Sequence, residues 1–444
     1  MKKKFLIGLI FGIFISSACL ISFISIDSPL RTSIFTKVGI TSSLEERPFG
    51  NRPMNENQSQ NNVELEENPL DVVYAEDINT SKDLVQGDIE TIIVNDSNNI
   101  EIDKSGSYLI TGTANNGSIK IEDNVKNVVL ILKDLDLTSI NSSTLNIGKN
   151  SQVKIIVEGS VTLTDNEDIS NDGLEDFDGC AIKIKDGADV YLTGSGDLNI
   201  YGNTKNGIKS GNDSLTSFVI DGDLNLNIFA SNDAINSGYD LFIYNGNITI
   251  NAGDDAIHSD RILTIGKEDS KNLNITIESC NEGFEGSIVN FINGNTTISS
   301  TDDAVNAANS DGLYKDEFTY AINILGGNHT INAGVDGLDS NGDINIVGGF
   351  TIINAKQAGG DAGIDYDNKC YINEDVVENN AGISGPDNLM FGGMKNGNGM
   401  GNGTFDKDFN PDGQNMNFDG KNPPDFNGEN FENVPERKDI QNNQ

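Results

Sequence analysis

The stretch Asn251-Ala-Gly-Asp-Asp-Ala-Ile-His-Ser259 contains an acidic turn, a small residue, one apolar residue and one further polar residue. We call it the motif, because similar stretches recur along the chain, for example at residues 231–237 and 301–306. Copies are 21 to 33 residues apart, and their small residue falls at positions 181, 207, 234, 256, 283, 304, 337 and 363. A period in the twenties that tolerates insertions is typical of a solenoid.

The residues between copies alternate between apolar and polar, as in Asn247-Ile-Thr-Ile-Asn251, and are bounded by Asn-Gly or Gly-Asp turns. Such patterns indicate short strands with one buried face. The sequence therefore predicts an all-β fold, a right-handed parallel β-helix with about three strands per coil. The apolar residue of each motif should stack in the core as one ladder: Ile182, Ile208, Ile235, Ile257, Phe284, Val305, Leu338 and Ile364.

The distribution of apolar, charged and polar residues along the chain predicts four segments. Residues 1–26 begin with three lysines and continue as an apolar run that is long enough to cross a bilayer of roughly 30 Å. We expect a retained membrane anchor, while cleavage after Ala18 or lipidation of Cys19 remain open. Residues 27–75 are polar and predict a linker, residues 76–385 the β-helix, and residues 386–444 a disordered tail rich in Gly, Asn, Met and Asp. Each outcome at the N-terminus places the folded part outside the cell, either held at the cell surface or secreted.

Composition limits the chemistry. The chain has 29 Lys plus Arg against 68 Asp plus Glu, a net charge of −39, which argues against nucleic acid as a partner and suits divalent cations. Only two histidines and four cysteines are present, which excludes a histidine-rich metal site and a disulfide scaffold.

The carboxylates of the motif are the candidate functional groups. In a β-helix, equivalent positions of neighbouring coils lie about 4.8 Å apart, so Asp233, Asp255, Asp303 and Asp336 should stack. Bare carboxylates at that distance repel, and Ca²⁺, which takes 6–8 oxygen ligands, would offset the repulsion. The alternative is that Asp, Asn and Gly only form turns here. That alternative explains the pairs Asp254-Asp255 and Asp302-Asp303 less well.

A second acidic segment, residues 165–178, has the composition of a calcium loop but lacks the EF-hand spacing, since Gly179 stands where the bidentate Glu belongs. A solvated loop and a calcium loop both remain open.

The repeated motif, the apolar strands and the Gly/Met/Asn-rich tail resemble a clostridial-type family of secreted carbohydrate-binding domain-containing proteins. The resemblance covers residues 80–385 and implies a pectate-lyase-like β-helix that binds cellulose and acidic sugars, with calcium at the coil edges. Lys183 and Lys209 depart from the motif's acidic pattern. On the matching positions the implied metal ligands are Asp233, Asp254, Asp255, Glu285, Asp302, Asp303, Asp336, Asp339, Asp361 and Asp365.

The chain contains no Trp, the preferred platform for stacking neutral sugars, and this absence favours an acidic sugar bridged through metal. Plant or cell-wall polysaccharide, with polygalacturonate as the example, is therefore the expected partner, and cellulose is a weaker candidate. The expected substrate-binding residues are Asn236, His258, Asn306, Tyr239 and Tyr366.

Two alternatives differ in class. A calcium-dependent pectate lyase needs a Lys or Arg base beside the metal, and Lys183 and Lys209 are the candidates, although they would equally offset neighbouring acids. A structural cell-surface adhesin without a specific sugar is the other alternative. Binding without catalysis remains the main prediction.

Overall fold

The computed structural model describes residues 70, 72–96, 99–166, 179–308, 312, 314–356 and 361–386. These residues form 30 β-strands and two 3₁₀ turns, η1 (Ser81–Asp83) and η2 (Glu374–Val376). The described ranges contain no helix with the length and apolarity needed to cross a membrane. The predicted anchor at 1–26 lies outside the described residues, as do nearly all of the predicted linker and tail, so these three assignments stay predictions.

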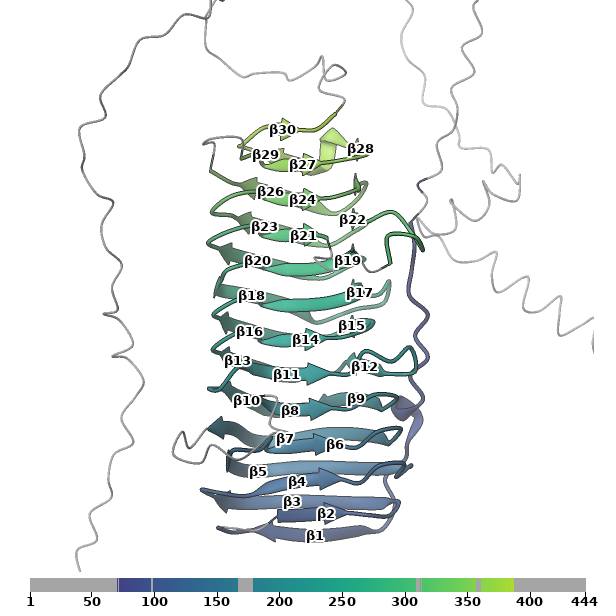
Figure 1. The fold of residues 1–444 in the computed structure, drawn as a ribbon, viewed down its shortest axis with the longest axis vertical. Helices are drawn as coiled ribbons and strands as arrows, with labels where there is room; N and C mark the ends of the chain where they lie inside the picture. The colour runs from purple at the N-terminus through teal and green to yellow at the C-terminus, as the bar shows by residue number, and fades with distance from the viewer. Residues whose placement is uncertain are drawn as a thin grey trace, which may run out of the picture. The chain divides into compact units, whose positions relative to one another are not determined.

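The strands pair in parallel with strands one coil away and form three ladders that run from β1 to β30 (Figure 1). The ladder that carries the motif, here the motif ladder, contains β2 (Asn99–Ile102), β4 (Ser118–Ile121), β6 (Leu145–Ile147), β8 (Cys180–Ile184), β11 (Asn206–Ser210), β14 (Ile235–Ser237), the first part of β17 (Ile257–Ile265), the first part of β19 (Phe284–Phe291), β21 (Val305–Ala307), β24 (Leu338–Ser340), β27 (Ile364–Tyr366) and β30 (Ile383–Ser384).

The other two ladders complete each coil. The second contains β1 (Ile89–Val94), the first parts of β3 (Gly106–Ala114), β5 (Val128–Ile140) and β7 (Gln152–Asn166), then β9 (Asp189–Gly194), β12 (Ser217–Ile220), β15 (Leu241–Ile243), the ends of β17 and β19, β22 (Ala321–Ile324), β25 (Asp343–Ile346) and β28 (Cys370–Ile372). The third contains the ends of β3, β5 and β7, then β10 (Asp197–Gly202), β13 (Asn225–Ala230), β16 (Gly246–Ala252), β18 (Leu273–Cys280), β20 (Asn295–Ser300), β23 (Asn328–Asn332), β26 (Phe350–Asn354) and β29 (Val377–Asn379). The predictions of an all-β fold and of parallel pairing are confirmed.

The predicted apolar ladder is present in the core. Ile235 pairs with Ile257, Ile257 with Phe284, and Phe284 with Val305, and each of these side chains has an exposed fraction of 0%. Burial of one such side chain stabilises the fold by about 1.5–3 kcal/mol relative to leaving it in water. Because every coil repeats this position, the ladder joins neighbouring coils throughout the described residues.

Asparagine forms a second kind of ladder, on the solvent side of the third ladder of strands. The amide of Asn247 donates to Asn225 at 3.1 Å, Asn274 to Asn247 at 2.9 Å, and Asn295 to Asn274 at 2.9 Å. The stacking satisfies donors and acceptors from coil to coil. Part of the asparagine content therefore supports the fold and is not available as ligand oxygens.

Residues 72–84, the N-terminal strap, run along the outside of the coils (Figure 1). At one end the amide of Asn290 donates to the backbone oxygen of Val73 at 3.0 Å; toward the other, the amide of Asn79 donates to the backbone oxygen of Val190 at 2.9 Å. Val73 also packs against a small apolar cluster. The packed part of the chain therefore begins before the predicted boundary at residue 76.

Truncation of one core rung tests the stacking. Ile257→Ala should lower the free energy of unfolding by roughly 2–5 kcal/mol, because it leaves a cavity between two coils, and Ile257→Val by about 1 kcal/mol. Thr276→Ala, at an exposed position of β18, is the control and should change it by less than about 0.5 kcal/mol. Denaturant titration measures all three, and an Ile257→Ala effect no larger than the control would contradict the assignment.

Candidate functional site

The residue after the apolar residue of each motif points out of the core. In β17, Ile257 and Ser259 are buried and His258 is partly exposed, as the pleat of a strand requires. His258 pairs with Asn236 on one side and Glu285 on the other. This position forms what we call the outward column, whose members are Glu101, Lys120, Asn146, Lys183, Lys209, Asn236, His258, Glu285, Asn306, Asp339, Asp365 and Ser384.

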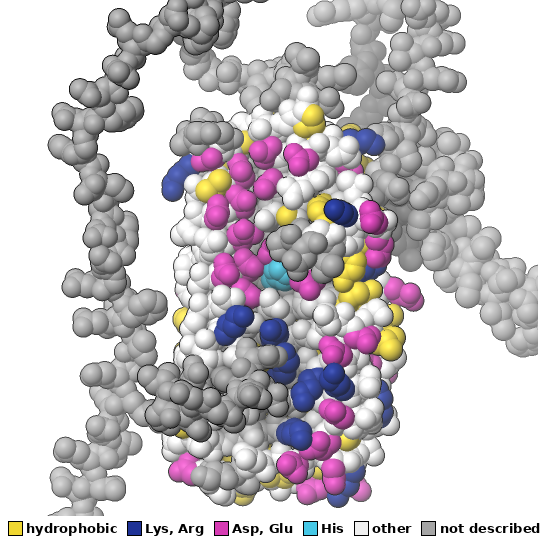
Figure 2. Space-filling view, viewed as in Figure 1, with side chains coloured by type: hydrophobic (Ala, Val, Ile, Leu, Met, Phe, Trp, Pro, Cys, Tyr) yellow, Lys and Arg dark blue, Asp and Glu magenta, His cyan; other side chains and the backbone are white. Residues whose placement is uncertain are grey.

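The charge of the outward column changes sign along the coils. Lys183 and Lys209 are paired neighbours in β8 and β11. Asp339 and Asp365 are paired neighbours in β24 and β27. Figure 2 shows acidic side chains gathered in a band over the C-terminal coils and basic side chains over the preceding coils. The acidic band and the basic region of this face therefore attract ions of opposite sign.

A second column lies beside it, at the residue before the small residue of each motif. Its acidic members, here the carboxylate column, are Asp233, Asp255, Glu282, Asp303 and Asp336. The backbone N–H group that follows each of the first four members donates to the backbone oxygen of the next member at 2.9–3.1 Å. Asp233, Asp255 and Asp303 are buried, with exposed fractions of 4%, 8% and 9%. We call this column, together with positions 236–365 of the outward column, the acidic strip.

Glu282 is the member that the sequence prediction missed. Its motif copy, Cys280-Asn-Glu-Gly-Phe-Glu285, has Glu and Gly where other copies have Asp and Ala. The fixed offset of one residue before the small residue is the signal that identifies it.

Burial dominates the electrostatics of the acidic strip. It is the largest cause that raises the pKa of Glu282 to about 8, of Asp339 to about 7 and of Asp303 to about 6, and repulsion between neighbouring carboxylates adds to it. Burial followed by repulsion from Asp255 also raises the pKa of Asp233. Burial and mutual repulsion destabilise the ionised forms of these carboxyl groups. Protons or cations should therefore bind among them.

His258 lies among three carboxylates. Its Nδ1 atom is 3.1 Å from Oδ2 of Asp255 and 2.6 Å from Oε2 of Glu285, and its Nε2 atom is 2.8 Å from Oδ1 of Asp260. Burial lowers the pKa of His258, but the hydrogen bonds to these carboxylates outweigh it and raise the pKa well above its usual value. Asp255, His258 and Glu285 offer ligand atoms within 4.8 Å of one another.

Asn306 presents an unsatisfied acceptor in the strip. Its amide nitrogen donates to Oε2 of Glu282 at 3.0 Å, while its buried Oδ1 atom has no hydrogen-bond partner among the described residues. An unpaired buried oxygen beside acidic side chains suits a bound cation.

The remaining predicted ligands lie around the two columns. Asp254 and Asp302 directly precede members of the carboxylate column and are partly exposed. Asp361 is partly exposed and precedes Ala362, which stands at the column position in the last predicted copy. Asp365 continues the outward column. The structure thus brings all ten predicted carboxylates to one face.

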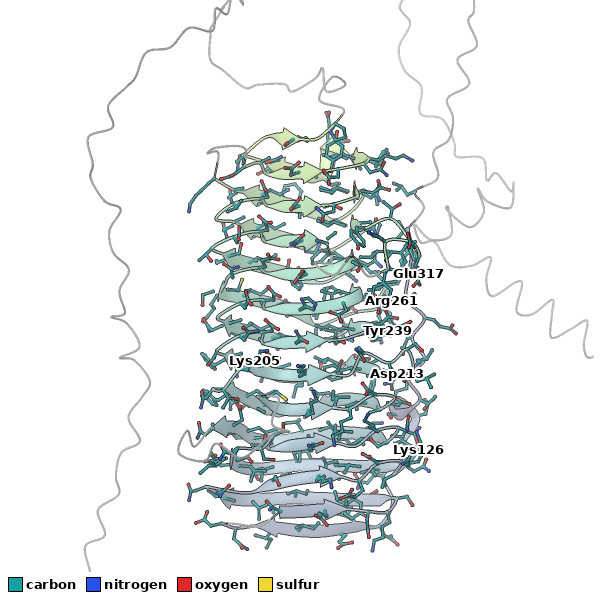
Figure 3. The ribbon with its side chains drawn as sticks, viewed as in Figure 1. Lys126, Lys205, Asp213, Tyr239, Arg261 and Glu317 are labelled. Carbon is teal, nitrogen blue, oxygen red and sulfur yellow. The ribbon has the colours of Figure 1, made fainter. Side chains whose placement is uncertain are left out.

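The two tyrosines that were predicted to contact sugar, Tyr239 and Tyr366, do not present a fully open ring at this face. Tyr366 has an exposed fraction of 3%, so its ring is buried and the prediction of a sugar contact there needs correction. The ring of Tyr239 lies 5.1 Å from the guanidinium of Arg261, which also pairs with Glu317 at 2.6 Å; Figure 3 places these three side chains along one edge of the coils. One face of Tyr239 is therefore engaged in holding Arg261.

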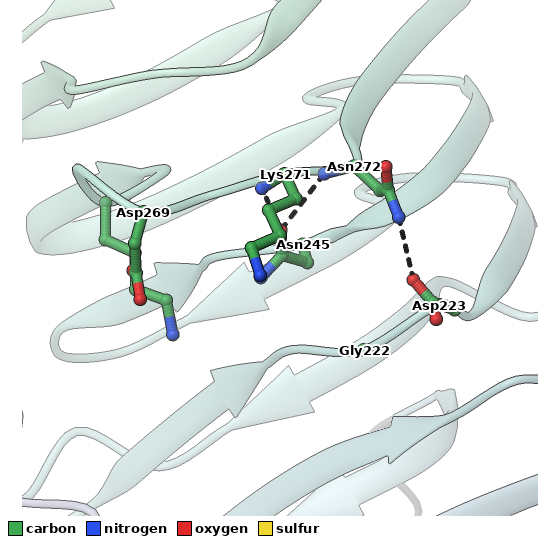
Figure 4. Close-up of a pocket in the computed structure, with 7 residues that line it drawn as sticks. Gly222, Asp223, Asn245, Asp269, Lys271 and Asn272 are labelled. Atoms are coloured by element: carbon green, nitrogen blue, oxygen red, sulfur yellow. Dashed lines mark hydrogen bonds between the residues drawn. The ribbon is translucent and has the colours of Figure 1, made fainter.

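A shallow pocket lies in turns away from the motif ladder (Figure 4). Within it, Asn245 Oδ1 accepts from the backbone N–H groups of Lys271 and Asn272. Asn272 in turn donates to Asp223 at 3.0 Å. The lining residues are Gly222, Asp223, Asn245, Lys267, Asp269, Lys271 and Asn272. Much of its polar surface is thus paired internally.

The predicted calcium loop at 165–178 lies, from residue 167 onward, outside the described residues. Asp165 itself is fully buried, accepts a hydrogen bond from the hydroxyl of Thr204, and has a pKa that burial raises. Its Oδ1 atom has no hydrogen-bond partner among the described residues, and the calcium assignment of this segment stays a prediction.

The raised pKa values predict how stability depends on pH. A carboxyl group whose pKa is raised by folding contributes its stability below its unfolded pKa and loses it as pH rises through the folded pKa. Without metal, the Tm should therefore fall between pH 5 and pH 8.5, as Asp303, Asp339 and Glu282 ionise near 6, 7 and 8. In Glu282→Gln the decrease in Tm over this pH range should be smaller by about 3 °C or more. A change of that size corresponds to about 1 kcal/mol in the free energy of unfolding.

The control for that experiment is Glu268→Gln, at an exposed loop position with the same change in net charge. Calorimetry in chelator at four pH values measures the three proteins. Equal slopes for Glu282→Gln and Glu268→Gln would contradict the assignment of Glu282.

Part of the chain is similar to a known protein family. Residues 96–263 match the model of a family described as carbohydrate-binding domain-containing protein. A search of curated proteins finds no match. Among solved structures, a gadolinium derivative of the polysaccharide lyase-like protein from C. thermocellum is 21% identical, with a TM-score of 0.34, over 66% of this chain and 98% of that one. The resemblance indicated by the motif is confirmed: over residues 96–263 the chain is similar to the carbohydrate-binding domain-containing family.

Proposed function

We propose that this protein binds extracellular polysaccharide through the acidic strip, with Ca²⁺ between the carboxylates of the protein and those of an acidic sugar. The coils would form a right-handed parallel β-helix that presents the strip as a rigid face. The observation that carries the proposal is the pair of acidic columns, in which buried carboxylates repeat from coil to coil. The family match at 96–263 supports carbohydrate as the ligand class.

The oxygen-rich part of the strip offers the type of donor atom that calcium prefers. Glu282, Asp303 and Asp339 supply carboxylate oxygens, and Asn306 supplies the neutral Oδ1 atom that is otherwise unpaired. Ca²⁺ prefers such oxygen donors and tolerates irregular geometry. When bound, it would supply positive charge that offsets the repulsion along both columns and attracts an anionic ligand.

An acidic polymer is favoured over a neutral one. With a net charge of −39, the protein would repel a polyuronate unless cations intervened. Tyr366 is buried and Tyr239 is engaged with Arg261, so the stacking surfaces that neutral sugars need are reduced. Polygalacturonate is our choice of ligand, and cellulose is the weaker candidate.

The location belongs to the same proposal. The lysines and apolar run of residues 1–26 would hold the chain at the cytoplasmic membrane, or direct its secretion, with the coils outside the cell. A surface position would bring the acidic strip to wall or plant polysaccharide.

A polysaccharide lyase is the second candidate. Lys183 and Lys209 are direct neighbours in the outward column, on the same face as the acids. One of their amines, in its neutral form, would act as the base that removes the proton from the carbon next to the uronate carboxylate. The electron pair would form a carbon–carbon double bond as the glycosidic carbon–oxygen bond breaks, and the leaving oxygen would take a proton from water. A structural adhesin, the third candidate, would neither bind a specific sugar nor cleave one.

Calcium should raise the Tm, and the double variant Asp303→Asn with Asp339→Asn should lose most of that increase along with polygalacturonate retention in affinity electrophoresis. The matched control, Asp269→Asn with Asp316→Asn, makes the same charge change at exposed positions and should behave as wild type. Unchanged retention by the first pair would place the binding site elsewhere.

Incubation with polygalacturonate and calcium separates binding from catalysis. We expect the polymer to be retained without an increase in absorbance from unsaturated products. Rising absorbance that Lys209→Ala removes would instead establish the lyase. The absence of both signals would favour the adhesin.

A further inference from the structure

The cluster around His258 differs chemically from the rest of the acidic strip. Its central atom is a ring nitrogen, Nδ1, and two carboxylate oxygens converge on it, Oδ2 of Asp255 at 3.1 Å and Oε2 of Glu285 at 2.6 Å. One ring N–H group can be donated to only one acceptor with good geometry. Two carboxylate oxygens that converge on one ring nitrogen bring three metal-binding atoms together, as the ligands of one cation are placed.

The opposite side of the ring is fixed independently. The Nε2 atom lies 2.8 Å from Oδ1 of Asp260, which is two residues along the same strand and outside the converging group. A carboxylate that accepts from the second ring nitrogen is the usual partner of a metal-binding histidine, because it sets the tautomer and the ring orientation. When a metal ion displaces the Nδ1 proton, this arrangement directs the Nδ1 lone pair toward Asp255 and Glu285.

We propose that Asp255, His258 and Glu285 form a site for a divalent transition-metal ion, with Zn²⁺ as the representative, bound through Nδ1 and one oxygen of each carboxylate. Zn²⁺ takes such nitrogen and oxygen ligands at about 2.0–2.1 Å, which places neighbouring ligand atoms about 3.3 Å apart in a tetrahedron. The two separations from Nδ1, 3.1 and 2.6 Å, would have to open toward this value, and the two carboxylate oxygens lie within 4.8 Å of each other. Three protein ligands leave one position for water.

Calcium is the poorer occupant of this site. It needs 6–8 oxygen ligands, whereas imidazole selects zinc, copper, iron or nickel. Among the described coils, Asp255, His258 and Glu285 are the group whose His, Cys or acidic ligand atoms converge within 4.8 Å. The strip would therefore bind two kinds of cation, zinc-like at His258 and calcium-like around Glu282 and Asn306. The inference does not depend on polysaccharide binding.

The histidine count makes the site testable. The chain has two histidines, and both ring nitrogens of His329 are engaged, by Thr296 at 2.9 Å and by the backbone oxygen of Gly326 at 2.8 Å. In the protein prepared without a histidine tag, titration calorimetry with Zn²⁺ and the visible spectrum with Co²⁺ should report one site at pH 7.5. His258→Asn reproduces the residue that neighbouring coils carry at 236 and 306, so it should fold while losing at least 100-fold in Zn²⁺ affinity.

Two further variants complete the test. Asp260→Asn should weaken Zn²⁺ binding by about 10- to 100-fold, as loss of a supporting carboxylate does. Asp269→Asn with Asp316→Asn, at exposed positions outside the strip, should leave it unchanged, although it removes more charge. No Zn²⁺ binding by the wild type, or equal binding by His258→Asn, would overturn the proposal and identify the cluster as a closed ion pair.

Discussion

Parallel stacking of equivalent positions is the constraint on which this structure depends. A parallel ladder places residue after residue of the same type about 4.8 Å apart along the coils. The consequence differs by side chain. Apolar residues such as Ile235 and Ile257 gain by burial, and asparagines such as Asn247 and Asn274 satisfy one another. Carboxylates gain nothing from each other.

The acidic columns therefore act against folding unless something neutralises them. Two like charges at this spacing repel by on the order of 3 kcal/mol at the effective dielectric constant near a protein surface. Burial increases the cost, as the raised pKa values of Glu282, Asp339 and Asp303 show. A fold that keeps several such groups on one face is suited to bind cations there. In the His258 cluster the imidazolium takes part of that role.

Two sets of contacts outside the acidic strip also stabilise the coils: those of the N-terminal strap and those of Arg261. The N-terminal strap crosses several coils and donates or accepts hydrogen bonds at intervals. Arg261 joins Asp240, Glu317 and the ring of Tyr239 at the edge next to the strip. Asp260, the neighbour of Arg261 in sequence, contacts Nε2 of His258, while Asp255 and Glu285 contact its other ring nitrogen. The position of the histidine is thus set from both sides.

The amino-acid sequence by itself determined the all-β class, the parallel stacking, the buried ladder from Ile182 to Ile364 and the alignment of the outward column, because all of these follow from local alternation and a fixed repeat. Lys183, Lys209 and the acids were placed on one face for the same reason. Only the tertiary structure decided that Tyr366 is buried and that Tyr239 holds Arg261. It also decided that Asp255, Asp260 and Glu285 converge on His258. These features depend on side-chain direction and desolvation between coils, which a repeat in one dimension does not specify.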